Sequence, residues 1–203
     1  MIIGPKYKIA RRLGAGVFEK TQTQKFALSE AKKKEVKGKR PRPKSDYGIQ
    51  MLEKQKARYS YALTEKQFSK YVKQAISKKG SDQKELLYQT LETRLDNAIL
   101  CAGVAPTRLA ARQLVSHGHI VVNGQRVTVP SIHVKIGDKL SIREGSLKKP
   151  VFATITERLT AKQSPSWLKV DPEKKEITVQ GLPKLAQDEL LFNIGQVLEF
   201  YSR

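Results

Sequence analysis

Residues 117–130 of the chain, HGHIVVNGQRVTVP, predict a β-hairpin closed by a two-residue turn. Apolar and β-branched residues flank Asn123-Gly124, and this dipeptide favours a type I′ turn because both central residues of that turn have positive φ. The preceding segment, TRLAARQLVSHG, predicts a helix that Thr107 caps and that ends at Gly118. A helix that runs directly into a hairpin is therefore the predicted centre of the fold.

The sequence on both sides of this unit predicts an α+β protein. Residues 45–63, 64–80 and 81–103 carry apolar side chains at helical spacing, and Thr64 is placed to cap the second of these helices. The apolar C-terminal stretch should dock onto the rest of the chain, since a loose tail would not carry so many apolar residues. Strands are expected as one pair within residues 133–144, turned at Gly137-Asp138, and as a second pair at Trp167–Val170 and Ile177–Gln180.

The same pattern predicts how the chain is divided. Pro41 and Pro43 disfavour helix within a strongly basic segment, so the N-terminal part is expected to be extended. The predicted parts are a basic extended N-terminal arm over residues 1–44, a helical N-terminal domain over 45–91 completed by about 191–203, a mixed module with two helices and an antiparallel sheet over 92–156, and the remainder of the mixed α+β domain over 157–190.

The charge of the chain indicates a polyanionic partner. Lys and Arg number 39 against 19 acidic residues, a formal net charge of +20. Nucleic acid is the first candidate partner and an anionic membrane surface the second. Because no apolar run reaches about 18 residues and no signal-peptide core is present, a bilayer span is not expected. We expect a cytosolic protein, or the mature form of an organellar one.

The chain carries no pattern that predicts catalysis, a metal or another cofactor. Cys101 is the single cysteine, and its place near the apolar face of a helix predicts an inert thiol. The three histidines lack metal-ligand spacing. The tripeptide Arg94-Leu95-Asp96 also occurs in the catalytic motif of RNA pseudouridine synthases, but here it continues in helical register. Asp96 is therefore expected to pair with Arg94 or a later basic residue.

Two kinds of nucleic acid are compatible with this charge. The helix-turn-helix character of residues 86–117 raises DNA binding, but the second helix enters a hairpin and no dimer seam is evident. A reader of folded RNA is favoured, because Arg108 and Arg112 are four residues apart and share one helix face. His119 and the Asn123-Gly124 turn extend the same edge, so helix and hairpin would form a rigid corner for an RNA groove.

The block ETRLDNAILCAGVAPTRLAARQLVSHGHIVVNGQRVTVPSIHVKIGDKLSIRE, residues 92–144, closely resembles the S-four RNA-binding domain. The segments on either side of this block show which family the chain resembles. They are GPKYKIARRLG near the start, SDYGIQMLEKQKARYSYALTEKQFSKY before the block, and PSWLKVD and EFYSR after it. Together they resemble the bacterial-type small-subunit ribosomal protein S-four, the uS-four family, over nearly the whole chain except residues 20–40.

This resemblance implies a non-enzymatic constituent of the small ribosomal subunit. It implies direct, early binding to small-subunit rRNA at a multi-helix junction of the 5′ domain. It also implies a position beside the channel through which mRNA enters, next to uS-five and uS-three, with influence on translational accuracy. No membrane, DNA or cofactor is implied, and the location is the ribosome of the cytoplasm or of an organelle.

The chain departs from the family pattern at two places. The chain lacks the N-terminal cysteines of many relatives, and FNIGQ replaces their usual pattern near the C-terminus. The alternatives are a free-standing RNA chaperone or translational regulator and, less favoured, a DNA-binding protein. The predicted rRNA contacts are Lys6, Lys8, Arg11, Arg12, Lys56, Arg58, Arg94, Arg108, Arg112, His117, His119 and Asn123, and the residues predicted to face mRNA are Lys39, Arg40, Arg42 and Lys44.

Overall fold

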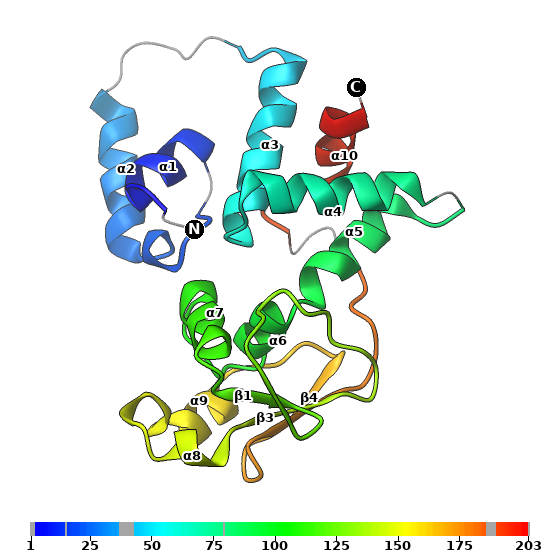
Figure 1. Cartoon of the computed structure of the whole chain (residues 1–203). Coiled ribbons are helices and arrows are strands. Elements are labelled where there is room, and N and C mark those ends of the chain that lie inside the picture. The colour runs from blue at the N-terminus through cyan, green and yellow to red at the C-terminus, as the bar shows by residue number, and fades with distance from the viewer. Residues whose placement is uncertain (1–2, 15, 37–42, 79, 186–189, 203) are drawn as a thin grey trace. The chain divides into compact units, whose positions relative to one another are not determined.

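A computed structural model describes residues 3–14, 16–78, 80–185 and 190–202, except 37–42. The chain forms two compact units, one of residues 1–84 with 186–203 and the other of residues 85–185 (Figure 1). Among the described helices, none combines the length and the apolar character that a membrane span requires.

The described part of the first unit is built from helices. In Figure 1, α10 lies beside α3. The 3₁₀ helix η1 is a single turn between α1 and α2. These elements are α1 (Lys6–Leu13), η1 (Glu19–Thr21), α2 (Gln24–Val36), α3 (Asp46–Ser60), α4 (Glu65–Ser77) and α10 (Ile194–Ser202).

The N-terminal arm is not extended over most of its described length, which corrects the prediction for residues 1–44. Helices α1 and α2 occupy it. Leu13 of α1 and Phe18 are buried in a small core, and Phe26 of α2 and Leu52 and Tyr59 of α3 pack against this core. Burying this apolar face offsets the repulsion among the basic residues. The proline-containing stretch 37–42 lies outside the described residues.

The C-terminal helix docks on α3, as its apolar character predicted. The backbone N–H of Asn193 donates to Glu53 Oε2 at 2.8 Å, and Gln50 Nε2 donates to Glu199 Oε2 at 3.1 Å. Thr64 caps α4 by accepting a hydrogen bond from the Gln67 backbone N–H at 3.4 Å, which confirms the predicted cap. Contacts between residues more than 130 positions apart therefore close the first unit.

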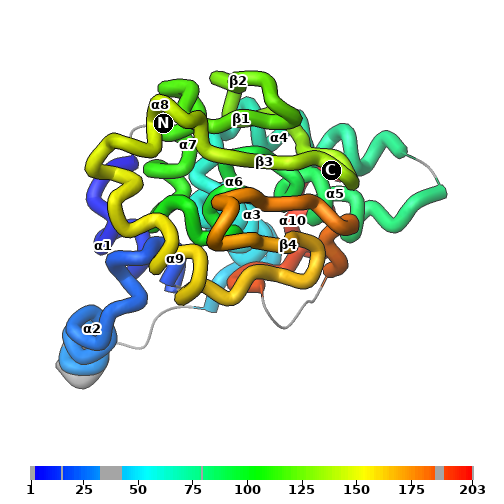
Figure 2. The backbone as a smooth tube through the Cα atoms, turned by 90° about the horizontal axis from the view of Figure 1, so that it is seen from below, coloured from blue at the N-terminus to red at the C-terminus, as the bar shows by residue number. Residues whose placement is uncertain are grey.

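The second unit contains a five-stranded antiparallel sheet in the order β2-β1-β3-β5-β4 (Figure 2). The predicted hairpin is confirmed, with Val122 opposite Gln125 and positive φ at Asn123 (49°) and Gly124 (80°), as a type I′ turn requires. The predicted pair near residues 167–180 is also confirmed. The strands are β1 (Ile120–Val122), β2 (Gln125–Val127), β3 (Lys139–Ile142), β4 (Leu168–Asp171) and β5 (Glu176–Val179).

The structure corrects two other predictions, and one set of backbone hydrogen bonds explains both. The expected helix over residues 81–103 breaks after α5 (Gln83–Glu92) and resumes as α6 (Leu95–Cys101). Between them Thr93 O accepts from Val134 N at 2.8 Å, and Leu95 N donates to Ile132 O at 2.8 Å. Residues 132–134 are thus paired with the helix break, so β3 forms without the expected partner strand.

Helices α6 and α7 (Arg108–Ser116) share one core with the sheet. Leu95, Ile99, Val115 and Leu140 are fully buried there. Three short elements follow β3 and add Phe152, among others, to the same core. Sequence periodicity did not predict them because each spans about one or two helical turns. They are α8 (Glu144–Leu147), η2 (Pro150–Phe152) and α9 (Ile155–Ala161).

Replacing Leu140 by alanine should lower the free energy of unfolding of the second unit by about 2–5 kcal/mol, because the change leaves a cavity in the core. Trp167, the chain's single tryptophan, is buried in this core, so its fluorescence in urea follows the unit's unfolding. The control is Leu182→Ala, at a side chain that is 48% exposed. Equal losses in the two variants would contradict the assigned core.

Candidate nucleic-acid interface

Helix α7 carries two arginines and is held in place by an N-terminal cap and by a buried apolar face. Thr107 Oγ1 accepts from the Ala110 backbone N–H at 3.1 Å and so confirms the predicted cap. One face of the helix buries Val115 and its apolar neighbours in the core. The side chains of Arg108 and Arg112 are partly exposed. The predicted pair of arginines on one helix is therefore present at the surface of the second unit.

A buried carboxylate holds one of these arginines. Asp96 binds Arg94 with both oxygens, at 3.0 Å from Nε to Oδ1 and 2.8 Å from Nη2 to Oδ2. Its Oδ2 also accepts from Nε and Nη2 of Arg112, each at 2.8 Å. This confirms the expected ion pairs of Asp96. Because Arg94 is only 2% exposed, its predicted direct contact with rRNA is corrected to a role inside the protein.

His119 is also buried, although it was predicted as an rRNA contact. Its Nδ1 lies 2.9 Å from Ser146 Oγ, and its ring packs edge-on against Phe152 with centroids 5.8 Å apart. Burial lowers the pKa of the His119 imidazole below its usual 6.5, and nearby positive groups lower it further. The role of His119 is therefore corrected to packing beneath the surface.

Basic side chains gather around His119: the ring centroid of His117 lies 5.9 Å from that of His119, and the Arg143 backbone N–H donates to the His119 carbonyl at 2.9 Å. They are Lys149, His117, Arg126 and Arg143, which we call the His119 basic cluster. All four are exposed, and of these only His117 was predicted as a site residue. The others follow no helical or strand period that separates them from the chain's many other basic residues, so the sequence alone did not single them out.

Arg126 links the hairpin to the end of α7. Its Nη2 donates to the backbone carbonyl of His117 at 3.3 Å. Gly118 makes room for this contact: its φ is +68°, and a Cβ atom there would lie 2.1 Å from Arg126 Nε. A glycine at this position therefore both ends the helix and admits the guanidinium group.

The tip of the hairpin is tied to the loop before β3. Asn123 Nδ2 donates to Asp138 Oδ1 at 2.8 Å, and Asn123 Oδ1 accepts from the Lys139 backbone N–H at 2.9 Å. Asp138 Oδ2 accepts in turn from the Lys135 backbone N–H at 2.7 Å. Asn123 remains exposed, and its side chain makes the tip rigid.

The predicted rRNA contacts of the first unit lie on α1 and α3. Arg11 forms an ion pair with Glu30 at 2.6 Å, and Lys56 forms one with Glu53 at 2.6 Å. The guanidinium carbon of Arg58 lies 4.3 Å from the centroid of the Tyr59 ring. Lys8 and Arg12 are exposed and Lys6 is partly exposed.

Of the residues predicted to face mRNA, Lys44 is exposed immediately before the Ser45 cap of α3. The predictions for Lys39, Arg40 and Arg42 lie outside the described residues.

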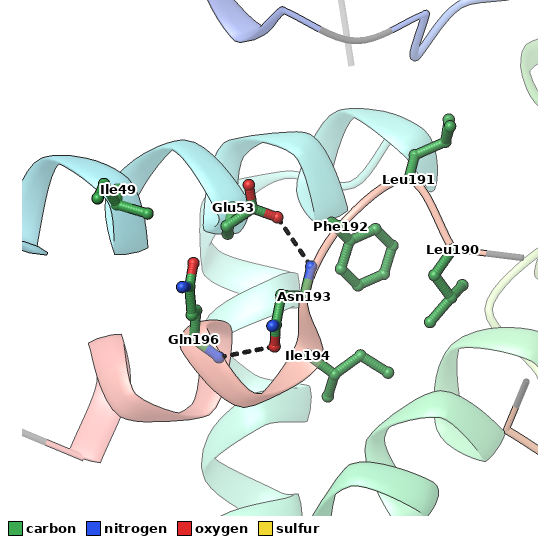
Figure 3. A pocket seen from close by; sticks show the side chains of 8 residues that line it. All are labelled: Ile49, Glu53, Leu190, Leu191, Phe192, Asn193, Ile194 and Gln196. Carbon is green, nitrogen blue, oxygen red and sulfur yellow. Dashed lines mark hydrogen bonds between the residues drawn. The ribbon is translucent and has the colours of Figure 1, made fainter. Parts of the chain in front are cut away.

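A groove between α3 and the segment that leads into α10 has a volume of about 530 Å³ and was not foreseen from the sequence (Figure 3). We call it the α3–α10 groove. Glu53 is the one charged side chain among the described residues that line it. In Figure 3, Glu53 bonds the Asn193 backbone, and Asn193 Oδ1 accepts from the Gln196 backbone N–H at 3.3 Å. Because its described lining includes the acidic Glu53, this groove does not suit a polyanion.

Family models match both parts of the chain. Residues 1–92 match the family model "Ribosomal protein S4/S9 N-terminal domain", and residues 93–140 match "S4 domain". The chain belongs to the uS4 family. It is 39% identical to "Small ribosomal subunit protein uS4" of Roseiflexus castenholzii over 203 residues, covering 99% of this chain and 98% of the relative. It is 43% identical over 208 residues to the protein of that name in Chromobacterium violaceum, with the same coverage.

Membership of the uS4 family confirms a structural RNA-binding protein rather than an enzyme. The candidate nucleophiles agree with this. Asp96 is buried and bound to two guanidinium groups, and burial raises the pKa of the Cys101 thiol to about 11. Among the described residues, no group of three or more His, Cys, Asp and Glu side chains could hold a metal ion.

Replacing Asp96 by asparagine should destabilise the second unit by about 3–5 kcal/mol, because the charge of the buried Arg94 would lose its partner. Urea unfolding followed by Trp167 fluorescence measures the change. Glu173→Asn, at an exposed position in the turn between β4 and β5, is the matched control. A loss below about 1 kcal/mol would show that Arg94 is not held by charge pairing.

The lowered pKa of His119 predicts acid sensitivity. Below pH 6.5 the unfolded chain takes up a proton on this imidazole more readily than the folded chain does, so stability falls as the pH drops from 6.5 toward the folded pKa. Urea midpoints between pH 7.5 and 5.5 should fall less steeply in His119→Gln than in the unchanged protein. Parallel profiles would contradict the prediction.

Proposed function

We propose that the protein is a structural constituent of the small ribosomal subunit that binds small-subunit rRNA directly, by charge and shape. The observation that carries this proposal is the His119 basic cluster at the end of α7, beside the rigid hairpin. The hydrogen bond from Arg126 to the His117 carbonyl holds this guanidinium group in place before RNA arrives. Less conformational entropy is then lost on binding.

The chemistry of the cluster suits an RNA backbone. Arg126 and Arg143 carry planar guanidinium groups that can bind phosphate oxygens with two parallel hydrogen bonds. Folded RNA is recognised largely through its shape and its sugar-phosphate strands. Partly exposed Arg108 and Arg112 on α7 add to the same kind of contact. The proposed mechanism needs no base-specific reading by this unit.

The proposal extends to finer features that uS4 family membership supports. These are early assembly at a multi-helix junction of the 5′ domain, a position beside the channel through which mRNA enters, and an influence on accuracy next to uS-five and uS-three. The place of action is the ribosome in the cytoplasm.

Sucrose-gradient sedimentation of a cell lysate, at moderate and then at high salt, tests the assembly. The protein should travel with the small subunit and stay there at high salt, since an integrated rRNA binder makes many contacts at once. Recovery in the top fractions would contradict the proposal and favour a free-standing RNA chaperone or regulator.

Filter binding to a 5′-domain rRNA transcript should give a plot of log K against log salt with a slope of about −6 to −9, if about 8–10 phosphates are neutralised. Arg143→Gln with Lys149→Gln should weaken binding and make this slope shallower by about 1–2. Arg112 is a poorer choice, because its loss also disturbs Asp96.

The matched control for that double variant is Lys169→Gln with Lys174→Gln. These two exposed lysines lie on β4 and in the turn after it, at the opposite edge of the sheet from β2. The net charge changes equally, so equal weakening in both double variants would show only a general effect of charge and would contradict a specific surface.

A further inference from the structure

A second groove, between α1 and α3 in the first unit, has a volume of about 520 Å³. We call it the α1–α3 groove. Leu13 and Leu52 give it apolar lining, and both belong to or contact the small core shared by these helices. Its volume falls within the range of about 300–1,000 Å³ that is typical of pockets for small organic ligands.

The two grooves on α3 differ in charge. Among its described lining residues, the α3–α10 groove of Figure 3 has one acidic and no basic side chain. The described residues that line the α1–α3 groove include three cations, Arg12, Lys44 and Arg58, and no acid, although Arg58 Nε also lies 3.6 Å from Glu65 Oε2 outside the groove. Among the described residues, no carboxylate pairs with Arg12 or Lys44, and both are exposed. Of the two, only the α1–α3 groove therefore suits a ligand that carries phosphate.

The same groove holds an aromatic ring and an amide. Tyr59 lines it, with the Arg58 guanidinium 4.3 Å from the ring centroid and the Phe18 ring packed edge-on at 6.0 Å. Gln55 Oε1 accepts from Arg58 Nε at 2.9 Å. The amide nitrogen of Gln55 can donate to the edge of a base. Proteins recognise unpaired RNA bases by stacking on aromatic rings and guanidinium planes and by bonding to base edges.

We propose that the α1–α3 groove receives one unpaired, splayed-out base of small-subunit rRNA. Tyr59 and Arg58 supply stacking, Gln55 contacts the base edge, and Arg12 and Lys44 bind the phosphates on either side. This inference rests on the proposed function and adds to it a base-binding site in the first unit. The second unit then binds shape and charge, while the first captures a single nucleotide.

Met51 and Ile49 provide a matched pair for the test. Both lie on α3, and they are 40% and 38% exposed, but Met51 lines the α1–α3 groove and Ile49 lines the α3–α10 groove. In the full-length chain, Met51→Trp fills the proposed base site. It should weaken binding to a 5′-domain rRNA transcript about tenfold, as expected when one stacked base is lost. Ile49→Trp should leave the affinity unchanged.

A photo-crosslinking side chain, p-benzoylphenylalanine, placed at the same two positions locates the ligand. In reconstituted small subunits, the group at position 51 should crosslink to one unpaired rRNA nucleotide or its immediate neighbours, and the group at position 49 should not. Crosslinks from position 51 to base-paired nucleotides or to a protein would overturn the inference.

The outcomes separate this inference from the function on which it rests. If the unchanged protein binds the transcript and Met51→Trp binds equally well with an unchanged urea midpoint, the base site is wrong and the rRNA-binding function stands. If the unchanged protein does not bind the transcript, the proposed function fails and the base site fails with it.

Discussion

The carboxylate of Asp96 is the constraint on which the second unit depends. It lies at the start of α6 and binds Arg94, in the break after α5, and Arg112, on α7. A buried charge is costly unless it is paired and hydrogen-bonded, so these three side chains have to be placed together. The pairing therefore sets how α6, α7 and the helix break meet, and it leaves Arg112 at the surface with a defined orientation.

The rest of that unit follows from the same break. Because Thr93 and Leu95 use their backbone groups to bind Val134 and Ile132, the following chain is brought back beside α6 before β3 begins. Residues 135–139 then bind the hairpin tip through Asn123. The hairpin carries Arg126 to the end of α7. The Arg126 guanidinium group, close to other exposed cations, is thus held by a neutral contact with the backbone.

In the first unit, too, some basic side chains are paired with carboxylates and others are not. Helix α3 has two grooves of nearly equal volume, one lined by cations and one by a single carboxylate. Glu53 and Glu65 hold nearby lysines, Lys56 and Lys54, in ion pairs within the unit. Among the described residues, no carboxylate pairs with Arg12 or Lys44, so both can bind an external anion. Of the two grooves, the α1–α3 groove, with its cationic lining, is therefore the one that can bind RNA.

Much of this could be predicted from local sequence. The type I′ hairpin needs only Asn123-Gly124 between β-branched residues, and the helix caps at Thr64 and Thr107 need only the neighbouring backbone N–H groups. The helix break at Thr93 could not be predicted, because its cause is hydrogen bonding to residues about 40 positions later. An apolar periodicity continues through the break and predicts one helix.

The sequence by itself determined the α+β class, the main helices, the hairpin and a polyanionic partner, since these follow from nearest neighbours and from total charge. Only the tertiary structure decided which basic residues face outward. Arg94 and His119 are buried, whereas Arg126, Arg143 and Lys149 gather at the surface. Whether a charged side chain is paired inside or offered to RNA depends on partners that are distant in sequence, and local patterns do not contain that information.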